Sequence, residues 1–153
     1  DRRQRQMCIR DRRGTIYGLT PLVNNTVCGD DFFEEAKATG HYVELDPAMS
    51  MEEAKKYAKD MDVLYTDTWV DMEFFNNPAY KQQKEETLAK MMPYQLNEEF
   101  TEGSRAIVFH DMPMHVGFEI SQGVIDKNLN HILDEAENRR HAEKAVMYTL
   151  LNS

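Results

Sequence analysis

The most constraining feature of this sequence is a short apolar run that stops at polar residues and a proline. Residues 106–109 read Ala-Ile-Val-Phe, and Pro113 follows four positions later. β-Branched and aromatic residues in so short a run predict a buried strand. Because proline cannot donate to a sheet ladder, the strand must end before Pro113. His110, Asp111 and Met112 are therefore expected at the carboxyl end of a strand, where open parallel sheets bind ligands.

Strand-like and helix-like segments alternate along the rest of the chain. The predicted strands are residues 15–19, 42–45, 63–66, 106–109 and 132–133. The predicted helices are residues 30–39, a segment opening after Ser50, residues 78–90, a short segment over 97–103, and a closing helix over 134–151. Strands separated by helices need crossover connections, so the sheet should be parallel. The sequence thus predicts an α/β fold, with a Rossmann-like parallel sheet and helices on both faces.

Composition limits the class of protein. A chain of 153 residues suits one domain, and its net charge of −9 argues against nucleic acid or a membrane surface as a partner. The sequence holds no apolar run long enough to span a bilayer and no signal-peptide pattern. Its two cysteines, Cys8 and Cys28, are typical of a reducing cytoplasm.

The first 13 residues differ from everything after them. They contain six Arg and two Asp, and no apolar period of either kind. We expect residues 1–13 to be a non-native or disordered leader, with a basic N-terminal arm as the alternative, and residues 14–153 to form the domain.

An acidic segment follows the third predicted strand. Residues 65–73 bring Asp67, Asp71 and Glu73 together with the single Trp of the chain, Trp69. Carboxylates gathered at one strand end repel one another unless a cation joins them, which favours a cationic substrate group or a metal. A solvated surface loop is the alternative.

The closing helix carries an arginine in line with apolar residues. Arg139 precedes Ala142, Val146 and Leu150 by 3, 7 and 11 positions, so it extends what should be a buried stripe. A guanidinium in that place needs either an internal carboxylate or an anionic ligand, and the spacing leaves both open.

Four segments resemble the C-terminal domain of the aspartate/ornithine carbamoyltransferase family. They are Asp-Thr-Trp-Val-Asp-Met at 67–72, Tyr-Gln-Leu-Asn at 94–97, His-Asp-Met-Pro at 110–113, and Glu-Ala-Glu-Asn-Arg-Arg-His-Ala at 135–142. The ornithine enzymes carry Asp-x-Trp-x-Ser-Met-Gly, Tyr-Gln-Val-Asn, His-Cys-Leu-Pro and Glu-x-Glu-Asn-Arg-x-His-x in this order. Four motifs in register, over roughly residues 14–151, are far more specific than any one of them.

The resemblance implies a role for each matching residue. Asp67 would bind the amine end of the acceptor amino acid, and Asp71 and Met72 would meet its other end. The strand-end residues His110, Asp111, Met112 and Pro113 would lie beside the carbamoyl group and the attacking amine. Arg139 would hold the carbonyl oxygen of carbamoyl phosphate. The family needs no metal and no cofactor for this reaction.

Departures from the family pattern indicate the charge of the acceptor and the lack of a phosphate-binding motif. Asp111 replaces Cys, Asp71 replaces Ser and Glu73 replaces Gly, so each change adds a carboxylate. They favour ornithine or another cationic amine over aspartate. No Ser-x-Arg-Thr phosphate-binding motif is present, so we expect an N-terminally truncated fragment that is inactive alone. The full enzyme should be a homotrimer through its N-terminal domain.

Three alternatives remain beside the transferase. His110, Asp111, His115 and Glu119 could suggest a metal site, although their spacing is not that of tight ligands. A nucleotide-binding module is a second possibility, without a glycine-rich phosphate loop to support it. The third is a paralogue that binds the ligand and catalyses nothing, since Asp111 replaces the family's Cys.

Overall fold

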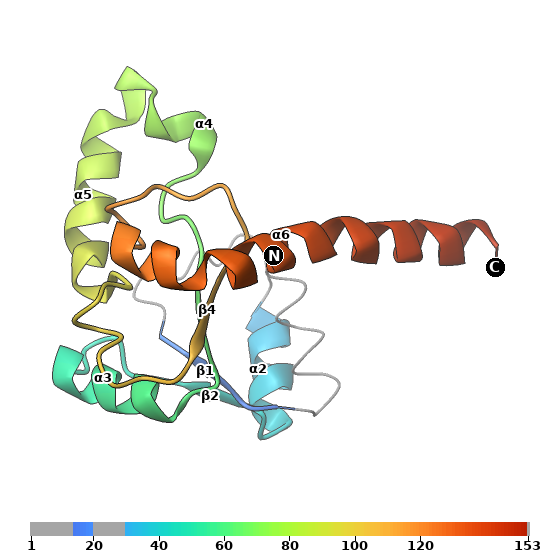
Figure 1. Ribbon diagram of the computed structural model, residues 1–153, viewed down its shortest axis with the longest axis horizontal. Helices are drawn as coiled ribbons and strands as arrows, with labels where there is room; N and C mark the ends of the chain where they lie inside the picture. Colours follow the sequence, from blue (N-terminus) through green and yellow to red (C-terminus); the bar gives the residue numbers. More distant parts are fainter. Residues whose placement is uncertain (1–13, 20–29, 153) are drawn as a thin grey trace. The chain divides into compact units, whose positions relative to one another are not determined.

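The computed structural model of the chain describes residues 14–19 and 30–152. The predicted leader and both cysteines lie outside these residues. The chain divides into two compact units, Asp1–Ser50 and Met51–Ser153. Parallel strands and helices alternate in both, as the sequence predicts for an α/β fold (Figure 1). The strands form two separate parallel pairs, β1–β2 and β3–β4.

The first unit contains strand β1 (Ile16–Gly18), helix α2 (Asp30–Ala38) and strand β2 (Tyr42–Glu44). Gly40, at φ 73°, follows α2 and donates from its backbone N to the carbonyl of Lys37. This is the usual way in which a glycine ends a helix. Gly18 lies against the ring of Tyr42, so a Cβ at this position would require the Tyr42 side chain to move.

The second unit contains the remaining elements and the main core. In chain order they are α3 (Met51–Asp60), β3 (Val63–Thr66), α4 (Met72–Phe75), η1 (Pro78–Tyr80), α5 (Lys81–Met91), η2 (Met92–Tyr94), β4 (Ile107–His110) and α6 (Gln122–Leu151). The predicted strand at 63–66 has the same bounds as β3. The predicted helix from Pro78 begins as a 3₁₀ turn, with Asn77 accepting from the backbone N of Ala79, and continues as α5. The short helix α4 was not predicted.

A single apolar cluster joins β4 to the first half of α6. Its buried members are Leu96, Val108, Ile120, Val124, Ile125 and Ile132, with Leu64, Phe100, Met112 and Met114 packed against them. Asn128 of α6 also accepts a hydrogen bond from the backbone N of Val108, at 3.0 Å. Because alternate amides of β4 point away from β3, this side chain satisfies a donor on the outer edge of the strand.

Two predicted elements of the second unit are wrong. Residues 132–133 form no strand, and no helix begins at Asp134, because α6 starts at Gln122 with Ser121 as its N-cap. The Ser121 hydroxyl accepts from the backbone N of Val124, and Ile132 is fully buried on the same helical face as Val124. In the helix, Ile132 is buried and its neighbour Leu133 is half exposed, and periodicity alone does not distinguish so short an apolar pair from a buried strand.

Residues 98–103 form turns, so the short helix predicted over 97–103 is also wrong. Asn97 accepts from the backbone N of Phe100, as a helix cap would, and Gly103 has φ 73°. The segment therefore makes the first bonds of a helix and stops. Within the described residues, no helix has the length and apolarity that a membrane span requires.

Candidate functional site

The carboxyl ends of β3 and β4 bring two predicted site residues together. The parallel register pairs Thr66 with His110, so Asp67 and Asp111 follow at the same edge of the strand pair. Their carboxyl groups are within hydrogen-bonding distance of each other. Asp67 also accepts from the backbone N of Thr68 at 2.7 Å and from its hydroxyl at 3.1 Å, which fixes the turn after β3.

A third carboxyl group reaches this place from α6. Glu135 is partly buried, hydrogen-bonds to Tyr65 of β3 and interacts with the charge of Asp111. From the sequence we predicted no site role for Glu135 or Tyr65. A helix start at Asp134 was predicted beside Glu135, where an acidic residue is common. Only the true start of α6 at Gln122 shows that Glu135 lies well inside a helix.

Burial and mutual repulsion set the proton affinity of these groups. Burial raises the pKa of Asp111 above its ordinary value, and the neighbouring Asp67 carboxyl raises it further. Burial also raises the pKa of Glu135, and the charge of Asp111 adds to that effect. Carboxyl groups in such an arrangement are stabilised by a shared proton or by a cation. The strand end can therefore hold a cation or a shared proton.

His110 lies beneath this cluster and is fully buried. Its Nδ1 accepts from the backbone N of Met112 at 3.0 Å, so the ring proton is on Nε2, which faces Oε1 of Glu119 at 3.3 Å. Met112 has φ 56° and precedes a cis peptide bond to Pro113. Glu119 and His110 thus hold a turn whose backbone conformation is rare for a residue with a side chain. Glu119 was considered from the sequence only as a possible metal ligand.

The remaining strand-end residues are less enclosed. Met112 is partly buried against the core, and Pro113 is exposed. Asp71 and Met72 are exposed at the start of α4, where the carbonyl of Asp71 accepts from the backbone N of Phe75. The structure thus places 67–72 as one loop that ends in a helical turn.

Arg139 does not occupy the buried stripe that the sequence predicts. Every residue from 137 to 152 is exposed, including Val146 and Leu150. The Nε of Arg139 pairs with Glu143, one turn further along α6, at 3.1 Å. The prediction of a buried stripe is wrong because helical spacing shows which residues share a face and not what covers that face. The structure therefore brings Asp67 and Asp111 together, whereas Arg139 pairs with Glu143 on the exposed half of α6.

No group of three or more His, Cys, Asp or Glu side chains suited to a metal ion occurs among residues 14–19 and 30–152. Of the four residues considered for a metal, His110 and Glu119 bond to each other, and His115 stacks on Phe75.

Comparison with known proteins adds to this geometry. Residues 14–150 match the family model described as "Aspartate/ornithine carbamoyltransferase, Asp/Orn binding domain". The chain belongs to the aspartate/ornithine carbamoyltransferase family. The ornithine carbamoyltransferase of Picrophilus torridus is 38% identical over 118 residues, which are 74% of this chain and 35% of that protein. That of Methanococcus aeolicus is 46% identical over 91 residues, 58% of this chain and 28% of that protein.

Solved structures of carbamoyltransferases share the fold. The anabolic ornithine carbamoyltransferase of Campylobacter jejuni has a TM-score of 0.64 at 25% identity, over 80% of this chain and 39% of that one. The enzyme of Pyrococcus furiosus has a TM-score of 0.57 at 31% identity, over 74% of this chain and 34% of that one. The chain spans about a third of the length of the curated relatives it matches.

Proposed function

We propose that this chain supplies the acceptor-binding half of a carbamoyltransferase that uses carbamoyl phosphate and a cationic amine, ornithine first among them. The observation that carries the proposal is the meeting of Asp67 and Asp111 at one strand end, with Glu135 beside them. Three carboxyl groups suit an acceptor that arrives with a positive charge. The names of the relatives support ornithine as that acceptor.

The proposed chemistry is an acyl transfer. Asp67 orients the acceptor amine, and the Asp67–Asp111 pair takes the proton that the ammonium loses. The neutral amine then attacks the carbonyl carbon, a C–N bond forms, the C–O bond to phosphate breaks, and the second proton of the amine leaves with the phosphate. Arg139 pairs with Glu143 in this structure, and its role is proposed from the family resemblance alone: it would stabilise the negative charge that develops on the carbonyl oxygen. Much of the rate would come from holding the two reactants in line.

The other site residues are proposed to shape the pocket. Asp71 and Met72 would meet the far end of the acceptor, while Met112 and Pro113 border the carbamoyl group. His110 would position Met112 through its hydrogen bond to the backbone. Binding of the phosphate and assembly as a homotrimer are proposed to belong to an N-terminal domain beyond this chain, and the reaction to be cytoplasmic. The isolated 153 residues should then show no turnover.

The acceptor is tested with the full-length enzyme that contains this chain. We expect carbamoylation of ornithine, or of a diamine if Asp71 disfavours the α-carboxylate, and none of aspartate. Asp111→Asn should lower kcat/KM for the amine by roughly 10²-fold, the usual scale for a proton-transfer group. An enzyme that carbamoylates aspartate and no cationic amine would contradict the proposal.

A second experiment addresses Arg139. Arg139→Gln should lower kcat by roughly 10²- to 10³-fold, the scale for removing one donor to a developing oxyanion. Glu143→Gln is the matched control, because it removes the partner of Arg139 and keeps the guanidinium. Equal losses in both variants would argue against the assigned role. A wild-type enzyme that binds ornithine yet transfers nothing would favour a non-catalytic paralogue, the alternative that Asp111 leaves open.

A further inference from the structure

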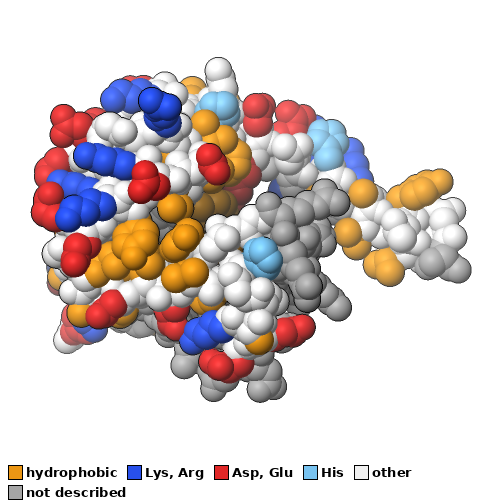
Figure 2. Space-filling model, turned by 90° about the horizontal axis from the view of Figure 1, so that it is seen from below, with side chains coloured by type: hydrophobic (Ala, Val, Ile, Leu, Met, Phe, Trp, Pro, Cys, Tyr) orange, Lys and Arg blue, Asp and Glu red, His pale blue; other side chains and the backbone are white. Residues whose placement is uncertain are grey.

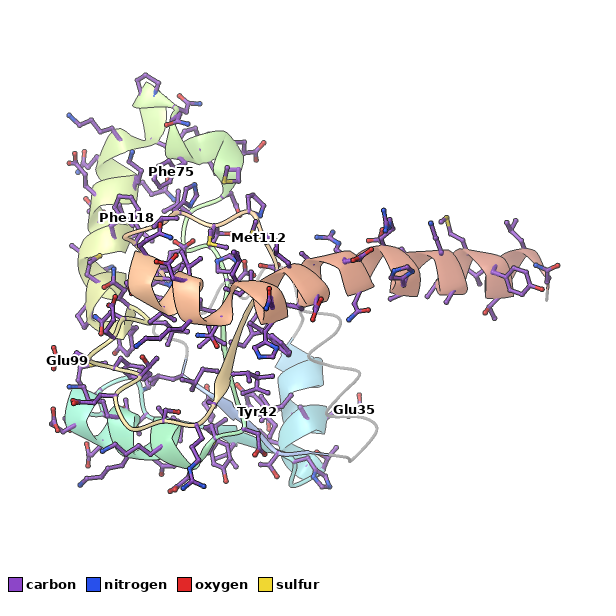
Figure 3. All side chains as sticks on the ribbon, viewed as in Figure 1. Glu35, Tyr42, Phe75, Glu99, Met112 and Phe118 are labelled. Atoms are coloured by element: carbon purple, nitrogen blue, oxygen red, sulfur yellow. The ribbon has the colours of Figure 1, made fainter. Side chains whose placement is uncertain are left out.

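An aromatic contact joins the proposed acceptor loop, residues 67–72 with α4 at its end, to the segment that follows β4. The ring of Phe75, in α4, stacks on the imidazole of His115, with centroids 3.6 Å apart and planes at 10°. The edge of Phe118 completes the group, 5.5 Å from Phe75 at 75°. Figure 3 shows Phe75 and Phe118 in the same region as Met112. We call Phe75, His115 and Phe118 the aromatic clasp.

The clasp holds the acceptor loop through the backbone of Phe75. Its N–H donates to the carbonyl of Asp71 at 3.1 Å, so a fixed Phe75 also fixes the residue at the loop's end. Lys84 of α5 donates to the carbonyl of Phe75 at 2.8 Å, and its Nζ stands 4.6 Å from the ring centroid. A shift of the Phe75 ring would therefore be transmitted to Asp71 and Met72.

The clasp is tied to the strand end by one buried carboxylate. Oε1 of Glu119 accepts from the backbone N of His115 and faces Nε2 of His110. His110 in turn accepts from the backbone N of Met112. Glu119, which is fully buried, thus holds both the loop that carries the clasp and the turn that carries Met112. The acceptor loop and the strand end are connected by an unbroken series of contacts.

His115 contributes its flat ring to this arrangement. Its Nε2 is buried and makes no hydrogen bond among the described residues, while its main-chain groups bond to Glu119 and Phe118. The side chain therefore contributes to the contact by stacking, which a phenylalanine can also do.

We propose that His115 is a positioning residue that sets acceptor affinity: its stack on Phe75 holds residues 67–72 over the end of β4. The inference rests on the proposed function, because it assigns a partner to the acceptor loop of that same site. An ordered loop would bind the acceptor without a further loss of conformational entropy. Loss of the stack should weaken acceptor binding and leave carbamoyl phosphate binding unchanged.

The first test measures loop order in the full 153-residue chain, independently of any turnover. Trp69 is the only tryptophan and lies inside the loop, so its acrylamide quenching reports on the loop directly. His115→Ala should raise the quenching constant about twofold or more, while His115→Phe should keep the wild-type value. Tyr80→Leu is the matched control, since Tyr80 meets Phe74 at 4.5 Å and lies outside the clasp.

Far-UV circular dichroism identifies a variant that has simply unfolded, and Phe75→Leu then replaces His115→Ala. An unchanged quenching constant in the folded variant would overturn the proposal. So would a rise in Tyr80→Leu as large as that in His115→Ala, because any lost ring contact would then loosen the loop.

The second test uses the full-length enzyme and separates acceptor from donor. His115→Ala should raise the KM for the amine roughly three- to tenfold, the scale of one aromatic pair, and His115→Phe should restore it. The KM for carbamoyl phosphate and kcat should stay within about twofold, a split that general destabilisation would not produce. Equal rises in both KM values would overturn the inference. If the wild-type enzyme transfers nothing, the proposed function fails, and Trp69 quenching alone decides the clasp.

Discussion

The two halves of α6 share one helical geometry and differ in what surrounds them. Residues 122–136 bury Val124, Ile125 and Ile132 in the core and bring Glu135 to the strand ends. Residues 137–151 are exposed at every position, although they carry Val146, Met147, Tyr148, Leu150 and Leu151. In Figure 2, apolar side chains surround the end of this helix that projects from the second unit.

The two halves show that the residues which form a helix do not by themselves determine which part of it is buried. Both halves have the residues and the spacing of a helix, and the backbone bonds run through all 30 residues. Only the first half faces β4 and the turn before Ser121. An exposed apolar surface of this kind usually marks an interaction site in proteins. Substitutions placed in matched pairs along α6 can therefore measure how far stability depends on each half.

The largest difference is expected between Ile132→Ala and Leu150→Ala. Ile132 is fully buried, so truncation removes packed atoms and leaves a cavity that costs about 2–5 kcal/mol of unfolding free energy. Leu150 is 71% exposed, and its truncation should change that free energy by less than ~0.5 kcal/mol. Urea unfolding of the two variants measures both values. Comparable losses would mean that the second half of α6 is packed in solution.

A smaller difference is expected between the two ends of the helix. Ser121→Ala removes the N-cap that accepts from Val124, together with the hydroxyl's bond to Glu98 at 2.8 Å. It should cost about 1 kcal/mol. Asn152→Ala removes a bond to the carbonyl of Tyr148 at the exposed end, where fraying makes the loss smaller than ~0.5 kcal/mol. Thermal unfolding followed by circular dichroism compares them. A larger loss at Asn152 would contradict the contrast between the two halves.

The next prediction concerns pH. The pKa of Glu135 is raised in the folded chain by burial and by Asp111, so the folded state binds a proton more readily than the unfolded state. Stability should therefore fall as pH rises from the ordinary Glu pKa, about 4.3, through the raised value. Glu135→Gln should flatten this fall, because the amide has no proton to lose. Because Glu135 is only partly buried, we expect an effect smaller than that of the cap.

Glu143→Gln is the matched control for the pH series, since it removes a carboxylate from the exposed half. Free energies of unfolding at pH 4, 5, 6 and 7 give the slope for each variant. The prediction fails if Glu135→Gln and the wild type show the same slope over this range.

The smallest effect is expected for Arg139→Ala in this chain. The Arg139–Glu143 pair is exposed on both sides and spans one helical turn, so its loss should cost about 0.2–0.5 kcal/mol, and less in high salt. Measurements of helicity at low and high salt test this. A cost above ~1 kcal/mol would show that Arg139 has a further partner in solution.

The sequence predicted local structure well where one signal dominated. Val63–Thr66 was predicted with its observed bounds, because a short β-branched and aromatic run stands between a helix and a polar turn. Asp67 and Asp111 were each predicted at the end of a strand, and they lie at one edge because the two strands are parallel. The bounds of β3 depend on residues close together in the chain. The positions of the two aspartates depend on the rule that parallel strands end at the same edge of a sheet.

The rest depended on contacts between distant segments. Ile132 was mistaken for part of a strand because nothing local shows that Val108 and Ile120 cover it. Glu135 was missed because its role depends on Tyr65 and Asp111, far away in sequence. Arg139 was predicted on a buried face because it lies in line with apolar residues. Helical spacing does not show whether other residues cover that face. The stack of His115 on Phe75 left no sequence signal that we recognised.

The hydrogen bond from Val108 to Asn128 has a consequence for how this strand pair can be extended. A neighbouring strand laid along the outer side of β4 would need that same amide, and the side chain of Asn128 already occupies it. Open strand edges invite pairing with other chains. A single asparagine, held by its own bond to the carbonyl of Val124, thus protects the middle of this edge from unwanted association.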